Sequence, residues 1–187
     1  MRAALGLEVG LGTIEFVMGL RDVPLGKNAP EEVNVIIEIP RFSTNKYEYD
    51  LEMDAMKLDR VLYSPLFYPW DYGFLPRTTY LDGDPIDALV LVSHPTFPGI
   101  VVEAKPIGVL EMVDQGMPDE KLLCVASKDP RFGNRGRMRD VHQHTLDEIV
   151  HFFEIYKQLE NKSVEIKGWK KREFAYEIIE KFKHEGE

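Results

Sequence analysis

The order of apolar patterns along the chain constrains its fold more than any other feature. Short strand-like runs occupy most of the sequence, and segments with helical periodicity appear only near its end. Strands are predicted at 33–39, which ends at Pro40, and at 46–51, 57–63, 88–92, 100–104, 107–113, 121–126 and 164–166. Strands that precede helices, rather than alternate with them, favour an α+β class in which a small twisted barrel or sheet is covered by helices.

Two helices are predicted near the carboxyl end of the chain. Thr145 and Glu148 have the spacing of a capping box, and apolar residues follow them at helical intervals as far as Leu159. We therefore expect one helix of about four turns that begins after Thr145. A second helix is expected over 171–183, where apolar residues again form one stripe.

Length and composition indicate a single domain of an ordinary globular protein. The chain has 187 residues, of which 44% are hydrophobic, and a formal net charge of -9. This charge argues against a protein that binds nucleic acid or anionic membranes, because such proteins need a basic surface. No apolar run approaches the roughly 20 residues that span a bilayer, and no signal-peptide pattern is present. The single cysteine, Cys124, is predicted to be a buried strand residue, and together these features predict a cytoplasmic protein.

The main candidate site is the sequence DGDPID at 82–87, which places three aspartates directly before an apolar strand. Neighbouring carboxylates repel one another, so Asp82, Asp84 and Asp87 need a cation or a proton to settle their charge. Hard divalent cations such as Mg2+ prefer such oxygen ligands. The alternative interpretation is a solvated acidic turn.

A second acidic pair, Asp114 and Asp119, lies in a loop that contains glycine and proline, with Lys121 just beyond it. Aspartate is common in such loops for turn formation alone, which is the simpler interpretation. The functional interpretation is a second set of metal ligands, because phosphoryl transfer to water needs cations that neutralise the developing charge.

Cationic and phenolic side chains provide candidates for phosphate binding. They are Lys46, Arg60, Tyr68, Tyr72, Tyr156 and Lys157. Each has a plainer interpretation as well. Lys46 and Glu48 lie on the same face of a predicted strand and fit an exposed ion pair, and the tyrosines fit core aromatics.

Taken together, these motifs resemble those of soluble family I inorganic pyrophosphatases of the bacterial type. The shared motifs are VIIEIP at 35–40, NKYEYD at 45–50, LDR at 58–60, FYPWDYG at 67–73, DGDPID at 82–87, Asp114 with Asp119 and Lys121, and HFFEIYK at 151–157. The resemblance runs from about residue 22 through the last helix. It implies Mg2+-dependent hydrolysis of pyrophosphate to two phosphates, a five-stranded OB-like barrel with two carboxy-terminal helices packed against it, and a homohexamer.

The resemblance also implies a role for each candidate residue. Asp84 matches the general base for a water that bridges two metals, without a covalent phosphoenzyme. The implied metal ligands are Asp82, Asp87, Asp114, Asp119 and Glu48, for about three to four Mg2+ ions, with Mn2+ or Zn2+ as substitutes. The implied pyrophosphate ligands are Lys46, Arg60, Tyr72, Tyr156 and Lys157, and the supporting residues are Glu38, Tyr68 and Lys121.

The sequence leaves open the roles of two segments and two alternative functions of the protein. Residues 1–21 extend beyond the start usual in the family, as a genuine extra segment or because Met18 is the true start. The basic stretch 128–139 fits a solvated or subunit-facing loop, with a regulatory anion site as the alternative. A hydrolase of another small phosphoanhydride and a catalytically silent OB-like binding protein are the alternative functions.

Overall fold

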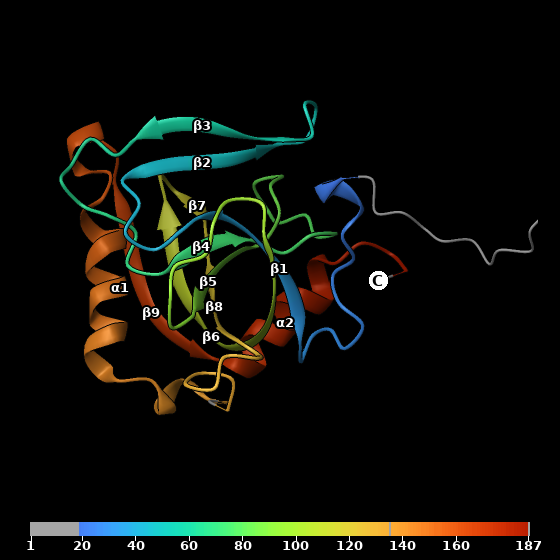
Figure 1. Ribbon diagram of the computed structural model, residues 1–187. Coiled ribbons are helices and arrows are strands. Elements are labelled where there is room, and N and C mark those ends of the chain that lie inside the picture. The colour runs from blue at the N-terminus through green and yellow to red at the C-terminus, as the bar shows by residue number, and fades with distance from the viewer. Residues whose placement is uncertain (1–18, 135, 187) are drawn as a thin grey trace, which may run out of the picture.

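The computed structural model describes residues 19–134 and 136–186, which form a strand-rich barrel with helices packed on its outside (Figure 1). The strands are β1 (Val33–Ile39), β2 (Asn45–Asp50), β3 (Ala55–Val61), β4 (Asp71–Phe74), β5 (Asp87–Leu91), β6 (Val101–Asp114), β7 (Met117–Pro118), β8 (Lys121–Ala126) and β9 (Val164–Lys171). The α-helices are α1 (Gln143–Ile155) and α2 (Arg172–Phe182), and the 3-10 turns are η1 (Leu20–Asp22), η2 (Met138–Asp140) and η3 (Gln158–Glu160).

Within these described ranges, five strands close a ring in the order β1, β4, β5, β8, β6 and back to β1. Only the β5–β8 pair of this ring is parallel. Strands β7 and β9 pair with β6 outside the ring, and β2 and β3 form a separate hairpin that lies over one end of the barrel (Figure 1). The predicted α+β class with a five-stranded OB-like barrel is therefore confirmed.

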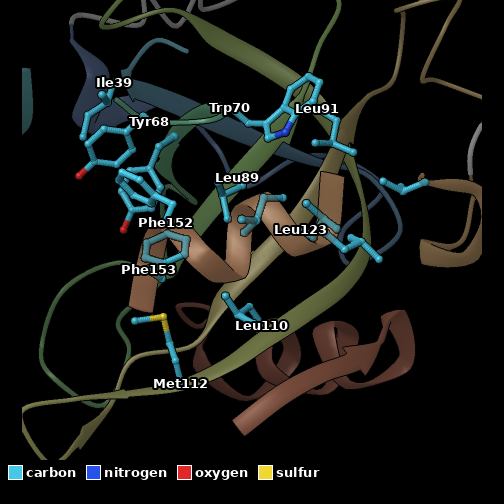
Figure 2. Packing of buried hydrophobic residues seen from close by; sticks show 14 of the residues in the cluster. Ile39, Tyr68, Trp70, Leu89, Leu91, Leu110, Met112, Leu123, Phe152 and Phe153 are labelled. Atoms are coloured by element: carbon cyan, nitrogen blue, oxygen red, sulfur yellow. The ribbon is translucent and has the colours of Figure 1, made fainter. Parts of the chain in front are cut away.

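The barrel strands are buried on both faces, which explains why they appear in the sequence as continuous apolar runs. In β5, Leu89 faces the cluster that contains Phe152 and Phe153 of α1 (Figure 2). Val90, one residue on, faces the other cluster, which contains Ile178 of α2. Because strand side chains alternate, the two helices cover opposite sides of the same strands. Cys124 in β8 is buried, as predicted, and burial raises the pKa of its thiol.

The predicted start and end of the first helix are wrong, although its 13 residues agree with the expected length of about four turns. Helix α1 begins two residues before Thr145, because the side chain of His142 caps it: Nδ1 accepts the backbone N–H two residues on at 3.2 Å. The proposed capping box with Glu148 is therefore not formed. The helix ends at Ile155, and Leu159 lies on η3 with 61% of its surface exposed, so it does not continue the apolar stripe.

Strand β6 joins two segments that were predicted separately, 100–104 and 107–113. Its pairing with β8 is irregular between Pro106 and Gly108, and this irregularity accommodates a proline that cannot donate a ladder hydrogen bond. The second helix agrees with the prediction within one residue at each end. In the part of the chain that the structure describes, no helix is both long and apolar enough to cross a bilayer.

Of the predicted amino-terminal extension, 1–21, residues 1–18 lie outside the described part of the chain. At its described end, Leu20 packs against Val23, Ile36 and Phe74. Arg21 Nε lies 3.6 Å from a carboxylate oxygen of Asp54, in the turn between β2 and β3. This end of the extension therefore contacts both the barrel and the hairpin.

Candidate active site

The acidic turn before β5 directs two of its three aspartates toward a cavity. Gly83 adopts φ of +94°, a left-handed conformation that favours glycine, and Asp82 Oδ1 accepts the backbone N–H of Asp84 at 3.1 Å. Asp84 and Asp87 line the cavity and Asp82 does not, although Asp82 and Asp84 are both exposed. The turn therefore presents two carboxylates to the cavity.

The cavity has a volume of about 200 Å³ and gathers residues from distant parts of the sequence. It is lined by Glu38 of β1, Lys46, Glu48 and Tyr49 of β2, Leu51, Tyr72 and Phe74 of β4, and Asp84, Pro85 and Asp87. Close approach of β4 to β1 requires glycine beside Tyr72, because a Cβ on Gly73 would lie 1.9 Å from the carbonyl oxygen of Ile36. This contact places the Tyr72 ring at the wall of the cavity.

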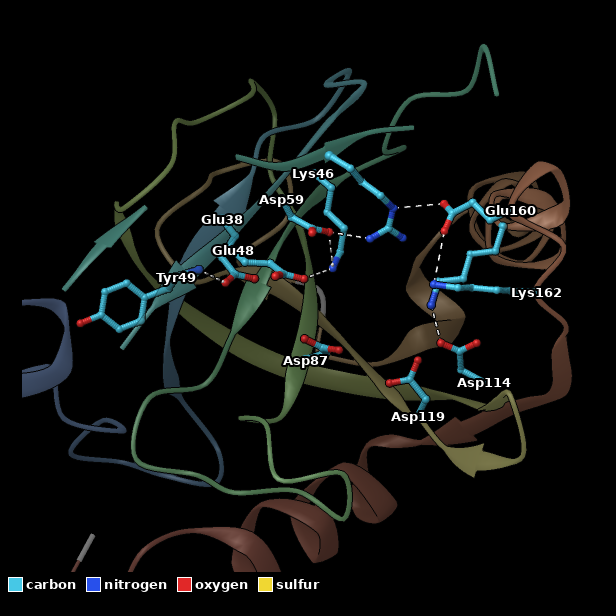
Figure 3. A network of polar contacts seen from close by, with 12 residues as sticks. Glu38, Lys46, Glu48, Tyr49, Asp59, Asp87, Asp114, Asp119, Glu160 and Lys162 are labelled. Atoms are coloured by element: carbon cyan, nitrogen blue, oxygen red, sulfur yellow. Dashed lines mark hydrogen bonds and ion pairs between the residues drawn. The ribbon is translucent and has the colours of Figure 1, made fainter. Parts of the chain in front are cut away.

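Lys121 joins the acidic turn to the second acidic pair. It is 2% exposed, and its Nζ donates to Oδ2 of Asp87 and to Oδ1 of Asp119. Burial alone would lower the pKa of Lys121, but the two carboxylates together raise it. Burial raises the pKa of Asp119, and Asp87 adds to the shift while Lys121 opposes it. Asp87 and Asp119 thus share one buried cation, and Figure 3 shows the two aspartates near one another.

Lys157 and Asp114 form the next part of the site. Lys157 Nζ pairs with Oδ2 of Asp114, while Oδ1 of Asp114 is buried and has no hydrogen-bond partner among the described residues. Tyr156, the residue before Lys157, is buried against Phe152 with ring centroids 5.1 Å apart. An unpartnered buried carboxylate oxygen has the capacity to accept a further hydrogen bond or to bind a cation.

Arg60 on β3 lies opposite Lys46 on β2, and both are bound to acidic side chains. Arg60 Nε donates to Glu160 Oε1 at 3.1 Å, and Nη1 pairs with Asp59. Lys46 Nζ pairs with Glu48 and lies 3.5 Å from Asp59 Oδ2. Burial would lower the pKa of Arg60, but Glu160 and Asp59 raise it. The predicted ion pair between Lys46 and Glu48 is present, and it lies inside the site.

The three candidate tyrosines are core aromatics, as their plainer interpretation predicts. Tyr68, Tyr72 and Tyr156 are buried core residues, and the Tyr68 ring centroid lies 5.4 Å from that of Tyr72 and 4.9 Å from that of Phe152. Burial raises the pKa of each hydroxyl, so that each phenol stays protonated and able to donate a hydrogen bond at neutral pH. Only Tyr72 among them lines the cavity.

The donor set suits a hard divalent cation. In the described ranges, no three histidine, cysteine, aspartate or glutamate side chains are grouped closely enough to hold a metal as they stand. Two of the candidate ligands are turned instead toward Lys121, and Asp114 is turned toward Lys157. All the candidate ligands are carboxylates, one of them with an unpartnered buried oxygen, so the chemistry of the residues present fits Mg2+.

Glu38 is expected to make the stability of the protein fall as pH rises. Burial raises its pKa from 4.5 to about 8 and Asp87 adds to the shift, whereas the N–H of Tyr49, which donates to Glu38 Oε1 at 2.8 Å, opposes it. Because the folded-state pKa lies above the unfolded one, this contribution is complete below the unfolded value and is lost as pH rises through the folded value. In EDTA, the free energy of unfolding should fall by on the order of a few kcal/mol over this window.

Urea titrations of wild type and Glu38→Gln at several pH values test this expectation. The glutamine keeps a neutral side chain throughout, so the variant should lack this part of the decline. Equal slopes in the two proteins would contradict the assignment to Glu38.

Sequence reasoning assigned no role to Asp59, Glu160, Lys162 or Tyr49. Asp59 has a local signal, since it lies beside Arg60 in a strand that pairs with Lys46. Glu160 has none, because its contact with Arg60 joins residues 100 positions apart. The described residues of the basic stretch 128–139 do not line the cavity, and its interpretation as a solvated or subunit-facing loop stays a prediction.

Comparison with known proteins agrees with this geometry. The family model described as inorganic pyrophosphatase matches residues 35–186. An inorganic pyrophosphatase from Synechocystis is 53% identical over 148 residues, covering 79% of this chain and 88% of its own. One from Halalkalibacterium halodurans is 50% identical, covering 81% of this chain and 93% of its own. The crystal structure of inorganic pyrophosphatase from Thermus thermophilus superposes with a TM-score of 0.84 at 45% identity, over 87% of this chain and 95% of that one.

Proposed function

The chain belongs to the inorganic pyrophosphatase family, and we propose on this basis that it hydrolyses pyrophosphate to two phosphates in the cavity described above. The observation that carries the proposal is the convergence of Lys46 and Glu48 of the hairpin with Asp84 and Asp87 of the acidic turn on one cavity. A lysine that can bind phosphate oxygens and carboxylates that suit a metal or a proton thus face the same space.

We propose that the cationic and phenolic residues hold the substrate. Arginine and lysine side chains bind phosphate oxygens through charge-assisted hydrogen bonds, and protonated tyrosines donate further ones. The residues assigned to this role are Lys46, Arg60, Tyr72, Tyr156 and Lys157. The supporting residues are Glu38, Tyr68 and Lys121, which pack or pair beside them.

Asp84 is the proposed proton acceptor. An oxygen of its carboxylate takes a proton from the attacking water as the water oxygen bonds to one phosphorus, and the bond from that phosphorus to the bridging oxygen breaks. The second phosphate leaves with the bridging oxygen, and no bond to the protein forms. Burial raises the pKa of Asp84, and Asp82 and Asp87 add to the shift, so this carboxylate holds a proton more readily than an isolated aspartate.

Mg2+ is the proposed cofactor, with Mn2+ or Zn2+ as substitutes, and about three to four ions per site are proposed from the family resemblance. Its proposed ligands are Asp82, Asp87, Asp114, Asp119 and Glu48. When bound, the metal supplies positive charge for the phosphates and makes a water more acidic. Lys121 pairs with Asp87 and Asp119, and Lys157 pairs with Asp114. These pairs support a site in which bound metal takes over from the lysines as the partner of the carboxylates.

A homohexamer in the cytoplasm is the proposed state of the protein, with no nucleic-acid or membrane partner. Phe42 and Phe67 form an exposed edge-to-face pair with centroids 5.5 Å apart, and Tyr63 nearby in sequence is exposed as well. Exposed aromatic surface of this kind supports self-association. Light scattering in solution tests the hexamer, and a monomer mass at working concentration would contradict it.

Phosphate release from pyrophosphate tests the proposed function directly. We expect rapid release with Mg2+, loss of release in EDTA, and much slower release from ATP and from a simple phosphomonoester. Fast release from ATP would favour a wider phosphoanhydride hydrolase. No release by the folded, Mg2+-loaded protein would favour the binding-protein interpretation.

A further inference from the structure

Alternating acidic and basic side chains form a continuous line beside the cavity (Figure 3). Glu48 pairs with Lys46, Lys46 lies 3.5 Å from Asp59, Asp59 pairs with Arg60, and Arg60 Nε donates to Glu160 at 3.1 Å. Lys46 and Arg60, two of the three cations proposed to bind phosphate, therefore share Asp59. The line passes out of the hairpin at Glu160.

Glu160 differs from the ordinary surface partners of this protein. Only 6% of its side chain is exposed, and its second oxygen, Oε2, lies 3.5 Å from Nζ of Lys162. By contrast, Glu165, which pairs with Lys167, is 64% exposed. Exposed pairs contribute little because solvent screens them, whereas a buried carboxylate is tolerated only when partners hold it in good geometry. Burial of Glu160 therefore holds its contact with Arg60 in place more firmly than an exposed ion pair would be held.

This contact also determines which part of the Arg60 guanidinium stays available. Arginine has five N–H donors in a rigid plane. Nε is bound to Glu160 and Nη1 to Asp59, while Nη2 has no hydrogen-bond partner among the residues that the structure describes. With two nitrogens of the plane held, the direction of the third is set before a ligand arrives, which lowers the entropy lost on binding.

Glu160 lies between the hairpin residue Arg60 and the Lys157–Asp114 pair, and it contacts both parts of the site. It is the last residue of η3, and its backbone N–H donates to the carbonyl of Lys157 at 2.9 Å. Lys157 in turn pairs with Asp114 on the far side. A single short turn thus holds Lys157 and, through Glu160, the Arg60 side chain of the hairpin.

We propose that Glu160 is a positioning residue for Arg60, which it orients for a substrate phosphate and couples to the turn that carries Lys157. This inference rests on the proposed role of Arg60 in binding pyrophosphate. Glu160 itself touches no substrate in this arrangement, and its effect passes through the guanidinium.

A double-mutant cycle in KM for pyrophosphate tests the inference, using full-length protein at saturating Mg2+. Glu160→Gln should raise KM roughly tenfold in the wild-type background, as expected for loss of a hydrogen bond between charged groups. In the Arg60→Ala background the same change should alter KM by less than about twofold, because its partner is already absent. Glu165→Gln is the matched control and should leave KM unchanged.

Three results would overturn the inference. An equal fold-increase in KM in both backgrounds would show that Glu160 supports the structure in general, and no change from Glu160→Gln would show that it has no such role. If Arg60→Ala leaves KM unchanged, both the role of Arg60 and this inference are wrong, although wild-type hydrolysis of pyrophosphate would still establish the reaction. Should thermal unfolding show that Glu160→Gln is not folded, Glu160→Asp is measured in the same two backgrounds with the same criteria.

Discussion

Asp84→Asn is expected to reduce the turnover of pyrophosphate by roughly 10²–10⁴-fold, the range typical for loss of a general base. The substitution keeps the shape of the side chain and removes its ability to accept a proton. The structure supports this choice, because Asp84 lines the cavity with Lys46 and Asp87, whereas Asp82 on the same turn lies outside the lining. An asparagine amide is too weakly basic to take the proton from the attacking water, so the contribution of the general base is lost.

The measurement is kcat at saturating Mg2+ and pyrophosphate, with substrate affinity determined separately. Binding should change little, because the proposed phosphate ligands are other residues. Asp147→Asn is a suitable control, since Asp147 lies on the exposed face of α1, where it accepts a hydrogen bond from Gln143 at 2.9 Å. Turnover close to that of wild type in a folded Asp84→Asn protein would remove Asp84 from its proposed role.

The barrel could be predicted from sequence because its strands are buried on both faces. Continuous apolar runs such as 88–92 and 122–126 are typical of such strands, and both are found in the ring. The start of α1 could not be predicted, because both His142 and Thr145 have side chains that can cap a helix at this point. Thr145 has the better sequence pattern, but the imidazole of His142 accepts the helix N–H in the folded chain.

The site could be predicted only where its chemistry is local. The acidic turn carries its own signal, since several carboxylates in six residues need a cation. The pairings of Arg60 with Glu160 and of Asp114 with Lys157 have no such signal, because these residues meet only when the segment that follows α1 packs near the hairpin and β6. Long-range pairs of this kind depend on tertiary structure, and no spacing in the sequence encodes them.

Lys121→Met is expected to destabilise the metal-free protein by about 3 kcal/mol, near the lower end for breaking a buried ion pair. Methionine fills a similar volume without charge, and Asp87 and Asp119 are then left facing one another. The lower end applies because 28% of the Asp87 side chain and 16% of the Asp119 side chain remain exposed. Lys167→Met is the matched control, since that lysine forms an exposed pair and its loss should change stability by less than about 0.5 kcal/mol.

The effect of Mg2+ on the free energy of unfolding distinguishes two causes of instability in the Lys121→Met protein: repulsion between Asp87 and Asp119, and general damage to the core. If Asp87 and Asp119 bind the metal, added Mg2+ neutralises the carboxylates that Lys121 now neutralises. Metal should therefore raise the free energy of unfolding more in the variant than in wild type, because ligands stabilise the state that binds them. Urea titrations with Mg2+ and with EDTA measure both values. An equal metal effect in the two proteins would mean that Lys121 and the metal do not share these carboxylates.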